Sequence, residues 1–413
     1  MTFGSLFAVG TLPVLAFTAS VPERPMNFDE AKVAPYELPD VLTLADGTKA
    51  TAETWPRRRR ELLDVLDREL FGRELPPPEA LVAEASTNEF ACSGFAVRRR
   101  YRMWFKADRS GPCVDWCAWL PNRPFGGMNR RDTALNPLKN APVVLLLNYN
   151  GNEALEAEPR DSRRHLPLQA ILARGYAVMT ARYEQIAPDD VDRMKEGVLS
   201  LFPSDAPDAP RSLGAWAWAL SRGLDLAGRI PEIDAKRCVV TGSSRLGKAA
   251  LLAGARDERF AIVVPNQTGK GGAPLWKRDY GENLSMFFRR ASSSWFLPSM
   301  KRYVADETKM PFDMHYLLAA VAPRHLLVQG FTTESFDPRG EFLALQAASP
   351  AWELLTGAGL PKVDFPSPYE TSAIGPRLGY VCRGGDHGIA AIDWRWTLDF
   401  ADRAFGELKG MLK

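Results

Sequence analysis

The chain has 413 residues, of which 46% are hydrophobic and 25% charged, a composition typical of a globular protein that buries a sizeable core. Its 52 basic and 50 acidic side chains leave a net charge of +2, which argues against nucleic acid as a partner, because such binding needs many cationic contacts. The composition also excludes a disordered chain, a collagen and a small disulfide scaffold.

The first 20 residues are predominantly apolar and carry no charged side chain. They resemble a secretion signal, although no basic residue opens them and glycines and a proline interrupt them. We expect either a signal, and hence a secreted or periplasmic protein, or an apolar arm packed on the domain. No other stretch is long and apolar enough to cross a bilayer, so no membrane partner is expected.

The predicted elements change in character near residue 140. Before it, we expect a helix over 61–66 and half-buried strands over 95–97 and 101–105. After it, helical stretches separate short, wholly apolar segments, which is typical of a parallel sheet covered on both faces. These segments cover residues 143–147, 175–179, 238–240, 260–264, 325–328 and 380–381. We therefore predict a single α/β domain over 21–413, a three-layer sandwich whose mostly parallel sheet has an antiparallel N-terminal edge.

The sharpest local signal is the segment from Val239 to Leu251. A β-branched strand stops at Gly242, and small residues lead directly into a helix-forming stretch, as at the strained turn that presents a nucleophilic serine. Gly242 and Gly247 provide the room that such a turn needs, but the second glycine comes one residue later than in the general motif. An ordinary strand-to-helix turn is therefore the alternative, whereas the spacing of a phosphate-binding loop is absent. The candidate nucleophile is Ser244.

Four histidines could serve as the base. In hydrolases with this turn the histidine follows the serine in the chain, which excludes His165. His315 lies in a helical stretch and His325 begins an apolar strand, so both are expected to be structural. His387 follows the last predicted strand in a glycine-rich loop, where a catalytic imidazole belongs. The alternative is that His387 is an ordinary surface residue.

Several segments together resemble the glucuronoyl esterases of carbohydrate esterase family 15. They are Gly242–Lys248, Asn266–Gly272, Tyr280–Asn283, Asp337–Phe342 and Gly385–His387, and upstream Asn27–Val33, Ala45–Gly47 and Asn148–Asn152. The resemblance covers nearly the whole chain after residue 25. It implies an α/β-hydrolase fold and cleavage of the ester between glucuronic acid on xylan and lignin alcohols. The partner would be glucuronoxylan or a lignin–carbohydrate ester, and we expect a monomer.

The resemblance also assigns roles by position. Ser244 matches the nucleophile and His387 the base, while Arg245 matches a residue that stabilises the oxyanion with its backbone N–H and side chain. Lys248 and Glu282 match residues that contact the sugar. Lys248 lies one helical turn after the serine, so its side chain can reach the same mouth of the sheet. The alternative, solvated charges at an ordinary helix start, is weakened because cations are disfavoured there.

The acid of the triad departs from the family pattern. Most members carry a glutamate where this chain has Gln267, and an amide cannot stabilise an imidazolium with a full charge. Glu334, after the next strand, occupies the usual acid position of α/β hydrolases and is our predicted acid. Asp337 is an alternative that we expect to be a turn residue. Asp386 is a weaker one, because its side chain and that of His387 should point apart.

Aromatic residues near the expected sugar site also differ from the family. Phe336 stands where many relatives have a tryptophan, which keeps an apolar platform but loses an N–H donor. Trp295 and Trp276 are expected near the mouth, whereas Trp216 and Trp218 should lie in the core. These departures leave two alternatives open: an esterase acting on methyl uronates or acetylated carbohydrates, and a weakly catalytic carbohydrate-binding homologue.

Neither a metal nor an organic cofactor is expected. The resemblance implies none, and the cysteines show no paired C-x-x-C spacing of the kind that binds zinc. Because they number five, at least one thiol should be free in the monomer. They are Cys92, Cys113, Cys117, Cys238 and Cys382.

Overall fold

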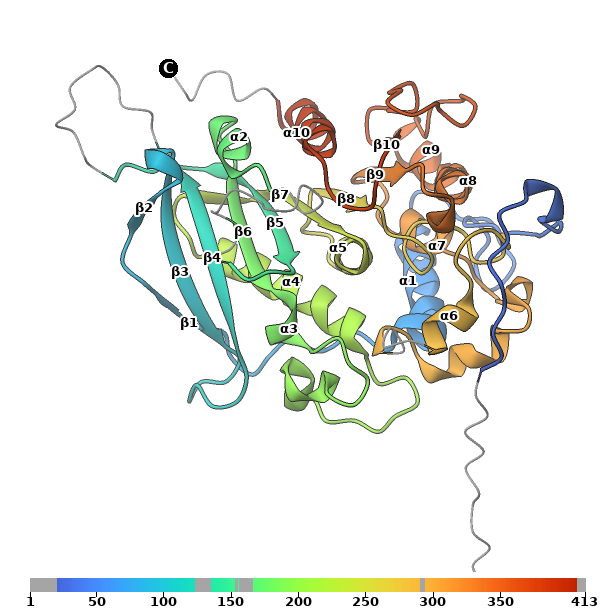
Figure 1. Ribbon diagram of the computed structural model, residues 1–413, viewed down its shortest axis with the longest axis horizontal. Helices are drawn as coiled ribbons and strands as arrows, with labels where there is room; N and C mark the ends of the chain where they lie inside the picture. The colour runs from blue at the N-terminus through green and yellow to red at the C-terminus, as the bar shows by residue number, and fades with distance from the viewer. Residues whose placement is uncertain (1–20, 123–134, 153–154, 156–165, 290–293, 407–413) are drawn as a thin grey trace, which may run out of the picture.

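The computed structural model describes residues 21–122, 135–152, 155, 166–289 and 294–406. The predicted signal or apolar arm over 1–20 and His165 lie outside these residues. Within them the chain forms one sheet with helices on both faces (Figure 1). The predicted α/β class with a mostly parallel sheet is confirmed.

The sheet has an antiparallel edge and a parallel remainder. Its strand order is β1-β3-β4-β6-β5-β7-β8-β9-β10, with β2 paired to β3. The antiparallel strands are β1 (Val82–Ala85), β2 (Glu89–Ala91), β3 (Ala96–Trp104) and β4 (Cys113–Pro121). The parallel strands are β5 (Ala141–Asn148), β6 (Ala177–Arg182), β7 (Ile233–Ser243), β8 (Ile262–Asn266), β9 (His325–Phe331) and β10 (Leu378–Arg383). Each of the apolar segments predicted after residue 140 contributes to one of the parallel strands.

Two apolar clusters fill the layers on either side of the sheet. Successive residues of a buried strand point to opposite faces, so Val143 and Leu145 join one cluster while Val144 and Leu146 join the other. The larger cluster packs under α1 (Trp55–Leu66), α4 (Ser212–Ala227), α5 (Arg245–Arg256) and α7 (His315–Ala319). The smaller one lies under α2 (Leu168–Ala173) and α10 (Ala391–Phe405), at the top of Figure 1. The remaining α-helices are α3 (Tyr183–Ile186), α6 (Leu284–Arg289), α8 (Pro338–Ala348) and α9 (Pro350–Thr356).

The N-terminal edge differs from the prediction in one respect. The two short strands expected over 95–97 and 101–105 are one continuous strand, β3. Between them lie Arg98, Arg99 and Arg100, whose charge looks like a break in sequence. In the sheet, the guanidinium groups of Arg98 and Arg100 pair with Glu89 of the neighbouring strand β2, so the strand continues through them.

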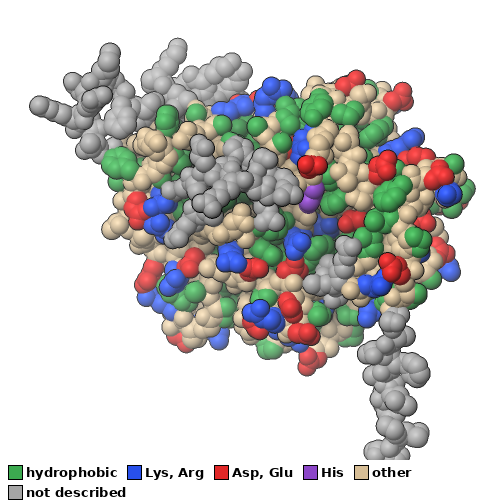
Figure 2. All heavy atoms as spheres, viewed as in Figure 1, with side chains coloured by type: hydrophobic (Ala, Val, Ile, Leu, Met, Phe, Trp, Pro, Cys, Tyr) green, Lys and Arg blue, Asp and Glu red, His purple; other side chains and the backbone are tan. Residues whose placement is uncertain are grey.

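The outer surface carries both signs of charge. Lys and Arg side chains are interspersed with Asp and Glu over the face shown in Figure 2, in keeping with the near-zero net charge. In the described part of the chain, every helix is too short or too polar to traverse a bilayer.

Candidate active site

The turn between β7 and α5 holds Ser244 in a backbone conformation that side chains rarely adopt. Its φ is 57° and its ψ −129°, and its N–H donates to the Asn266 carbonyl over 3.0 Å. A Cβ on Gly242 would lie 2.4 Å from the Leu246 carbonyl oxygen, and one on Gly247 would lie 2.8 Å from the Gly242 oxygen. The second glycine therefore allows α5 and β7 to approach each other closely, although it stands one residue later than in the general motif.

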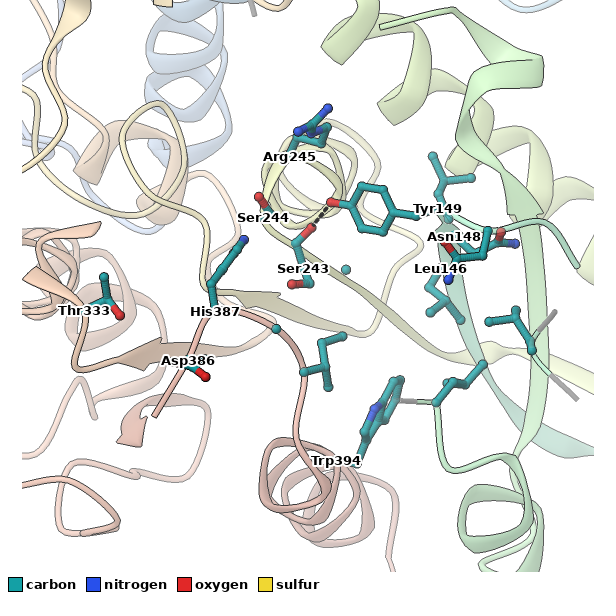
Figure 3. A pocket seen from close by; sticks show the side chains of 17 residues that line it. Leu146, Asn148, Tyr149, Ser243, Ser244, Arg245, Thr333, Asp386, His387 and Trp394 are labelled. Atoms are coloured by element: carbon teal, nitrogen blue, oxygen red, sulfur yellow. Dashed lines mark hydrogen bonds between the residues drawn. The ribbon is translucent and has the colours of Figure 1, made fainter. Parts of the chain in front are cut away.

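A pocket of about 650 Å³ opens at the carboxyl end of the parallel strands, beside this turn (Figure 3). Ser244 and His387 both line it, and in Figure 3 the imidazole points toward Ser244. Parallel strands place their following loops at one edge, which brings together residues that are 143 positions apart in sequence (387 − 244). The other lining residues are Leu146, Leu147, Asn148, Tyr149, Asn150, Leu155, Leu166, Gly242, Ser243, Arg245, Thr333, Asp386, Gly388, Ile389 and Trp394.

Gln267 holds the imidazole of His387. The Gln267 Oε1 lies 3.1 Å from His387 Nδ1 and accepts the Gly388 N–H over 2.7 Å, while its Nε2 donates to the Gly388 carbonyl over 2.9 Å. These bonds fix the orientation of the amide, so its oxygen faces the ring and Nδ1 must carry the hydrogen. The tautomer that results leaves the Nε2 lone pair of His387 available as a base. Gln267 itself is fully buried, and its φ of 49° is a second strained conformation at this edge.

Two phenylalanines, one at the end of β9 and one in the loop that follows, pack against the imidazole of His387. The ring of His387 lies 5.4 Å from that of Phe331 and 4.7 Å from that of Phe336, centroid to centroid. In sequence, Glu334 stands between these two phenylalanines and begins the single turn Glu334–Phe336. Its side chain is exposed to solvent. The structure thus brings its loop to His387, and the role of Glu334 as acid stays a prediction. Asp386 is exposed and its carboxylate points away from Ser244 in Figure 3.

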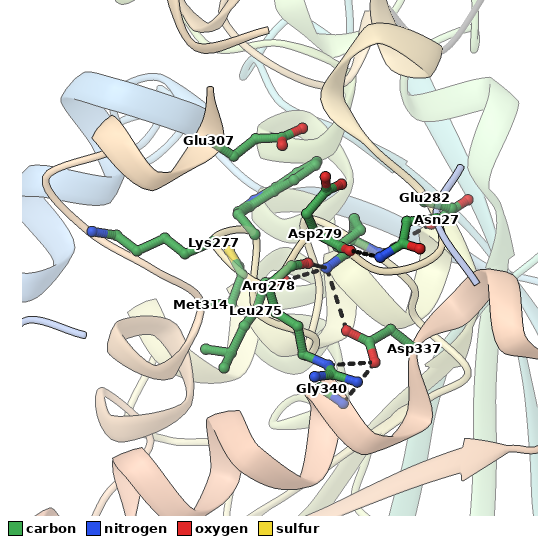
Figure 4. A network of polar contacts seen from close by, with 12 residues as sticks. Asn27, Leu275, Lys277, Arg278, Asp279, Glu282, Glu307, Met314, Asp337 and Gly340 are labelled. Carbon is green, nitrogen blue, oxygen red and sulfur yellow. Dashed lines mark hydrogen bonds and ion pairs between the residues drawn. The ribbon is translucent and has the colours of Figure 1, made fainter. Parts of the chain in front are cut away.

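Asp337, the alternative acid, occupies a buried structural position. It caps α8 by accepting the Gly340 N–H over 2.9 Å, and it accepts a hydrogen bond from Arg278 Nε over 3.0 Å (Figure 4). Lys270 Nζ lies 3.4 Å from its second oxygen. With both oxygens occupied by a helix cap and two cations, Asp337 fits the turn role expected of it.

The turn after β5 is held by Asn148. Its Nδ2 donates to Asn152 over 2.8 Å and to Thr180 over 3.0 Å, and its Oδ1 accepts the Gly151 N–H over 2.7 Å. Because the Gly151 N–H is bound to Asn148, it is not available to a ligand in the pocket.

Arg245 begins α5 directly after the serine. Its backbone N–H is at the first helical position and has no partner within the helix. Its guanidinium forms an ion pair with Asp189 and lies 5.0 Å from the ring centroid of Trp295. Asp189 also accepts hydrogen bonds from Ser294 and from the Trp295 indole. The Nε–H of Arg245 is buried and has no hydrogen-bond partner among the described residues.

Lys248 is buried on the Arg245 side of the serine. Its Nζ donates to the Thr268 carbonyl and lies 5.2 Å from the ring centroid of Trp295. Burial lowers the pKa of Lys248 to about 8, with Arg245 acting in the same direction, while the carboxylates of Glu282 and Glu341 oppose the shift. A charged ammonium in this position is a strong donor for a polar ligand, but the cost of desolvating it is high.

Glu282 and Phe336 meet at Gly269. A Cβ on that glycine would lie 2.4 Å from Glu282 Oε2 and 3.0 Å from the ring of Phe336, so both side chains pack directly on its backbone. Glu282 Oε2 accepts the Lys270 N–H over 3.0 Å. Trp276, expected at the mouth, is instead buried against Phe287 and Phe296 in the core.

Comparison with known proteins decides the family. Residues 163–356 match the family described as glucuronyl esterase, fungi. The prokaryotic carbohydrate esterase MZ0003 is 31% identical over 417 aligned residues, which cover 92% of each chain. The chain belongs to carbohydrate esterase family 15. A glucuronoyl esterase from Solibacter usitatus is 34% identical and superimposes with a TM-score of 0.81 over 92% of this chain and all of that one. A 4-O-methyl-glucuronoyl methylesterase from Phanerochaete carnosa is 27% identical over 84% of this chain and 81% of its own.

Membership of family 15 confirms the α/β-hydrolase fold and makes the chain a carboxylic ester hydrolase. The segments that carried the resemblance therefore identified the family correctly. They did not reveal the groups that support the loop around His387.

Arg383 is the most informative residue that sequence reasoning missed in this family 15 chain. Its guanidinium donates to the carbonyls of Gly384 over 2.9 Å and Asp386 over 3.0 Å, and also to that of Gly388. It is paired with the buried Asp393 through a 2.9 Å bond from Nε. Arg383 therefore ties down the loop on both sides of His387. The available signal was a charged residue that ends an otherwise apolar strand immediately before the histidine loop.

The other histidines and the cysteines have structural surroundings. His315 is buried with its Nε2 2.7 Å from the Pro39 carbonyl oxygen. Burial lowers the pKa of His325 to about 4, and its ring packs against Phe400. The five cysteines, all within the described residues, form no disulfide. Within the described ranges, no three His, Cys, Asp or Glu side chains are grouped to hold a metal ion.

Proposed function

We propose that this chain hydrolyses the ester between glucuronic acid, or its 4-O-methyl form, of glucuronoxylan and alcohols of lignin. The observation that carries the proposal is a strained serine that shares a pocket with a histidine whose tautomer is fixed by hydrogen bonds. The similarity to curated 4-O-methyl-glucuronoyl methylesterases supports the uronate as the acyl group.

In the proposed reaction, Ser244 is the nucleophile and His387 is the base. His387 Nε2 accepts the Ser244 proton as Oγ attacks the uronoyl carbonyl carbon. The oxyanion receives hydrogen bonds from the Arg245 N–H, from its buried Nε–H and from a backbone N–H of the 148–152 turn. The ester C–O bond then breaks, the imidazolium proton passes to the departing oxygen, and the acyl group stays on Ser244. Water, deprotonated by the same imidazole, releases the uronic acid.

Glu334 supplies the charge in this proposal and Gln267 the orientation. Gln267 is neutral, so it holds the ring without stabilising the imidazolium electrostatically. The exposed carboxylate of Glu334 belongs to the loop whose Phe336 packs against the ring. Lys248 and Glu282 bind the sugar hydroxyls, with Trp295 and Phe336 as apolar platforms.

The test is hydrolysis of three substrates by the purified protein: benzyl glucuronate, methyl glucuronate and an acetylated sugar. We expect both glucuronates to be cleaved, Ser244→Ala to abolish turnover, and the matched control Ser243→Ala, one residue away in the same pocket, to retain it. Turnover of the acetyl ester alone would make the chain an acetyl esterase. Sugar binding without ester turnover would make it a carbohydrate-binding homologue.

We also propose that the protein is secreted or periplasmic. The apolar composition of residues 1–20 supports this, and so does a polymeric substrate that cannot enter a cell. Detection of the full-length product in the cytoplasmic fraction alone would contradict it.

A further inference from the structure

A short segment near the N-terminus lies against the part of the chain that carries Glu282. We call this segment, Arg24–Asn27, the N-terminal strap. Arg24 and Asn27 are half-buried, while the two residues between them are exposed, so one edge of the strap faces the domain. Asn27 Nδ2 donates to the Asp279 carbonyl, 252 positions away in sequence, over 2.7 Å (Figure 4). The strap therefore packs on the segment that leads into Glu282.

The backbone of the strap binds the residues on both sides of Glu282. Before it, the Gly281 N–H donates to the Asn27 carbonyl over 2.8 Å. After it, Asn283 Nδ2 donates to the Arg24 carbonyl over 3.0 Å. Both neighbours of Glu282 are buried, so these bonds are shielded from water. The two ends of the strap thus hold the chain immediately before and after Glu282.

The side chain of Arg24 adds a charged anchor to the same region. Its guanidinium donates to Asp279 over 2.8 Å and forms an ion pair with Glu307, whose side chain is only 4% exposed. The other oxygen of Glu307 accepts the Leu284 N–H over 2.7 Å. Arg24 is therefore connected, directly or through one carboxylate, to the chain on both sides of position 282.

The printed contacts of Glu282 itself are made to groups near the active site. Its N–H donates to the Ser335 carbonyl over 2.8 Å, in the loop whose Phe336 packs on His387. Its Oε2 accepts the Lys270 N–H over 3.0 Å. Among residues 280–285, all of them described, only Glu282 is partly exposed. The segment is thus held between the strap and that loop, with Glu282 as the side chain that a ligand can reach.

We propose that the N-terminal strap is a positioning element of the sugar-binding site, which holds Glu282 so that its carboxylate meets the hydroxyls of the uronic acid. The inference rests on the proposed function for the sugar contact of Glu282 and adds the part of the chain that fixes it. Such a contact needs the carboxylate held to within about 0.5 Å, because a hydrogen bond weakens steeply as its geometry departs from the optimum. Loosening the strap should therefore weaken substrate binding and leave the chemical step at Ser244 unchanged.

The test compares Arg24→Gln with Arg174→Gln. Each substitution removes a guanidinium that pairs with two carboxylates, and the two side chains are 24% and 30% exposed, but Arg174 joins α2 to α10. We expect Arg24→Gln to raise KM for methyl glucuronate about fivefold with kcat nearly unchanged, a part of what one hydrogen bond to a charged group contributes. Arg174→Gln should leave KM unchanged. An unchanged KM in Arg24→Gln, or an equal rise in both variants, would overturn the proposal. If Arg24→Gln does not fold, Asn27→Ala, which keeps both ion pairs of Arg24, takes its place in the comparison.

A double-mutant cycle shows whether the strap acts through Glu282 or only on the fold. In the Glu282→Gln background, Arg24→Gln should raise KM by less than about twofold, because the contact that the strap positions is already lost. A further rise of about fivefold in that background would overturn the proposal, since the two residues would then act independently.

A binding measurement separates this inference from the proposed function. The Ser244→Ala variant is titrated with D-glucuronate and followed by NMR, which requires no turnover. Saturable binding that Arg24→Gln weakens and Arg174→Gln preserves supports the strap, even if glucuronate esters prove not to be substrates. The absence of glucuronate binding, or binding that Arg24→Gln leaves unchanged, overturns it.

Discussion

Replacing Arg383 by methionine tests how the loop that carries His387 is held. The substitution keeps most of the side-chain volume and removes a guanidinium that is only 5% exposed. It deletes the bonds to the carbonyls of Gly384, Asp386 and Gly388, and it leaves the carboxylate of Asp393, 1% exposed, without its cation. The substitution should therefore lower the stability of the fold and displace His387.

The free-energy loss can be bounded from these contacts. Removing one partner of a buried ion pair lowers the free energy of unfolding by about 3–5 kcal/mol. That figure already includes much of the loss of the hydrogen bonds that the charged guanidinium makes. We expect Arg383→Met to lower the free energy of unfolding by about 4 kcal/mol near pH 8. Burial raises the pKa of Asp393, and the Ala390 N–H and Arg383 both counter that shift. Without Arg383 the pKa rises further, so Asp393 binds a proton more readily when folded than when unfolded, and the loss is smaller near pH 5.

The assay is urea unfolding at both pH values, with kcat and KM for benzyl glucuronate. A displacement of His387 by about 1 Å is expected to reduce kcat roughly 10²-fold with little change in KM. Arg383→Lys restores the charge and should recover stability more than kcat, because one ammonium cannot reach three carbonyls. A methionine variant within 1 kcal/mol of the wild type near pH 8, with unchanged kcat, would refute the reasoning.

Three further outcomes follow from the site. Glu334→Gln is expected to lower kcat about 10²-fold, which is less than the ~10⁴ lost with a buried triad acid because Glu334 is exposed. Gln267→Ala should lower kcat by a smaller factor. A much larger loss of kcat in Gln267→Ala would reject Glu334 as the acid. Because burial lowers the pKa of Lys248 to about 8, its charge is lost as the pH rises through that value, and KM for a glucuronate ester should increase above it. In Lys248→Met, KM should be high and independent of pH, and a flat wild-type profile would contradict the role. Gly247→Ala places a Cβ 2.8 and 2.9 Å from two backbone carbonyl oxygens, so α5 must shift. Both the melting temperature and kcat should therefore fall. An unchanged melting temperature would show that the close contact is dispensable.

The parallel half of the fold was predictable because its strands are buried on both faces. Such strands read as unbroken apolar segments, and each of those predicted after residue 140 lies in the sheet. The antiparallel edge was harder to predict, since Arg98 to Arg100 interrupt the apolar pattern. In the structure Arg98 and Arg100 pair with Glu89 of the neighbouring strand, and Arg99 pairs with Glu232.

The candidate site was predictable where local backbone chemistry determines it. Glycines at the serine turn and a histidine in a glycine-rich loop are local signals, and parallel strands bring the loops together. The partner of the imidazole was not predictable in this way. Which atom of Gln267 faces His387 depends on bonds to Gly388 formed across the sheet edge, 121 residues apart in sequence. Asp189, which pairs with Arg245 from 56 residues away, left no local signal.

The amide at position 267 has a consequence for acid tolerance. A carboxylate there would both orient the imidazole and balance its charge, and protonation would end both tasks at the same pH. The Gln267 amide does not titrate, so its bonds to His387 and Gly388 persist at any pH at which the domain stays folded. The alignment of the imidazole is thereby independent of any titration at position 267. Acid that protonates the imidazole removes the base but leaves the ring in place, and the ring can act again when the proton leaves.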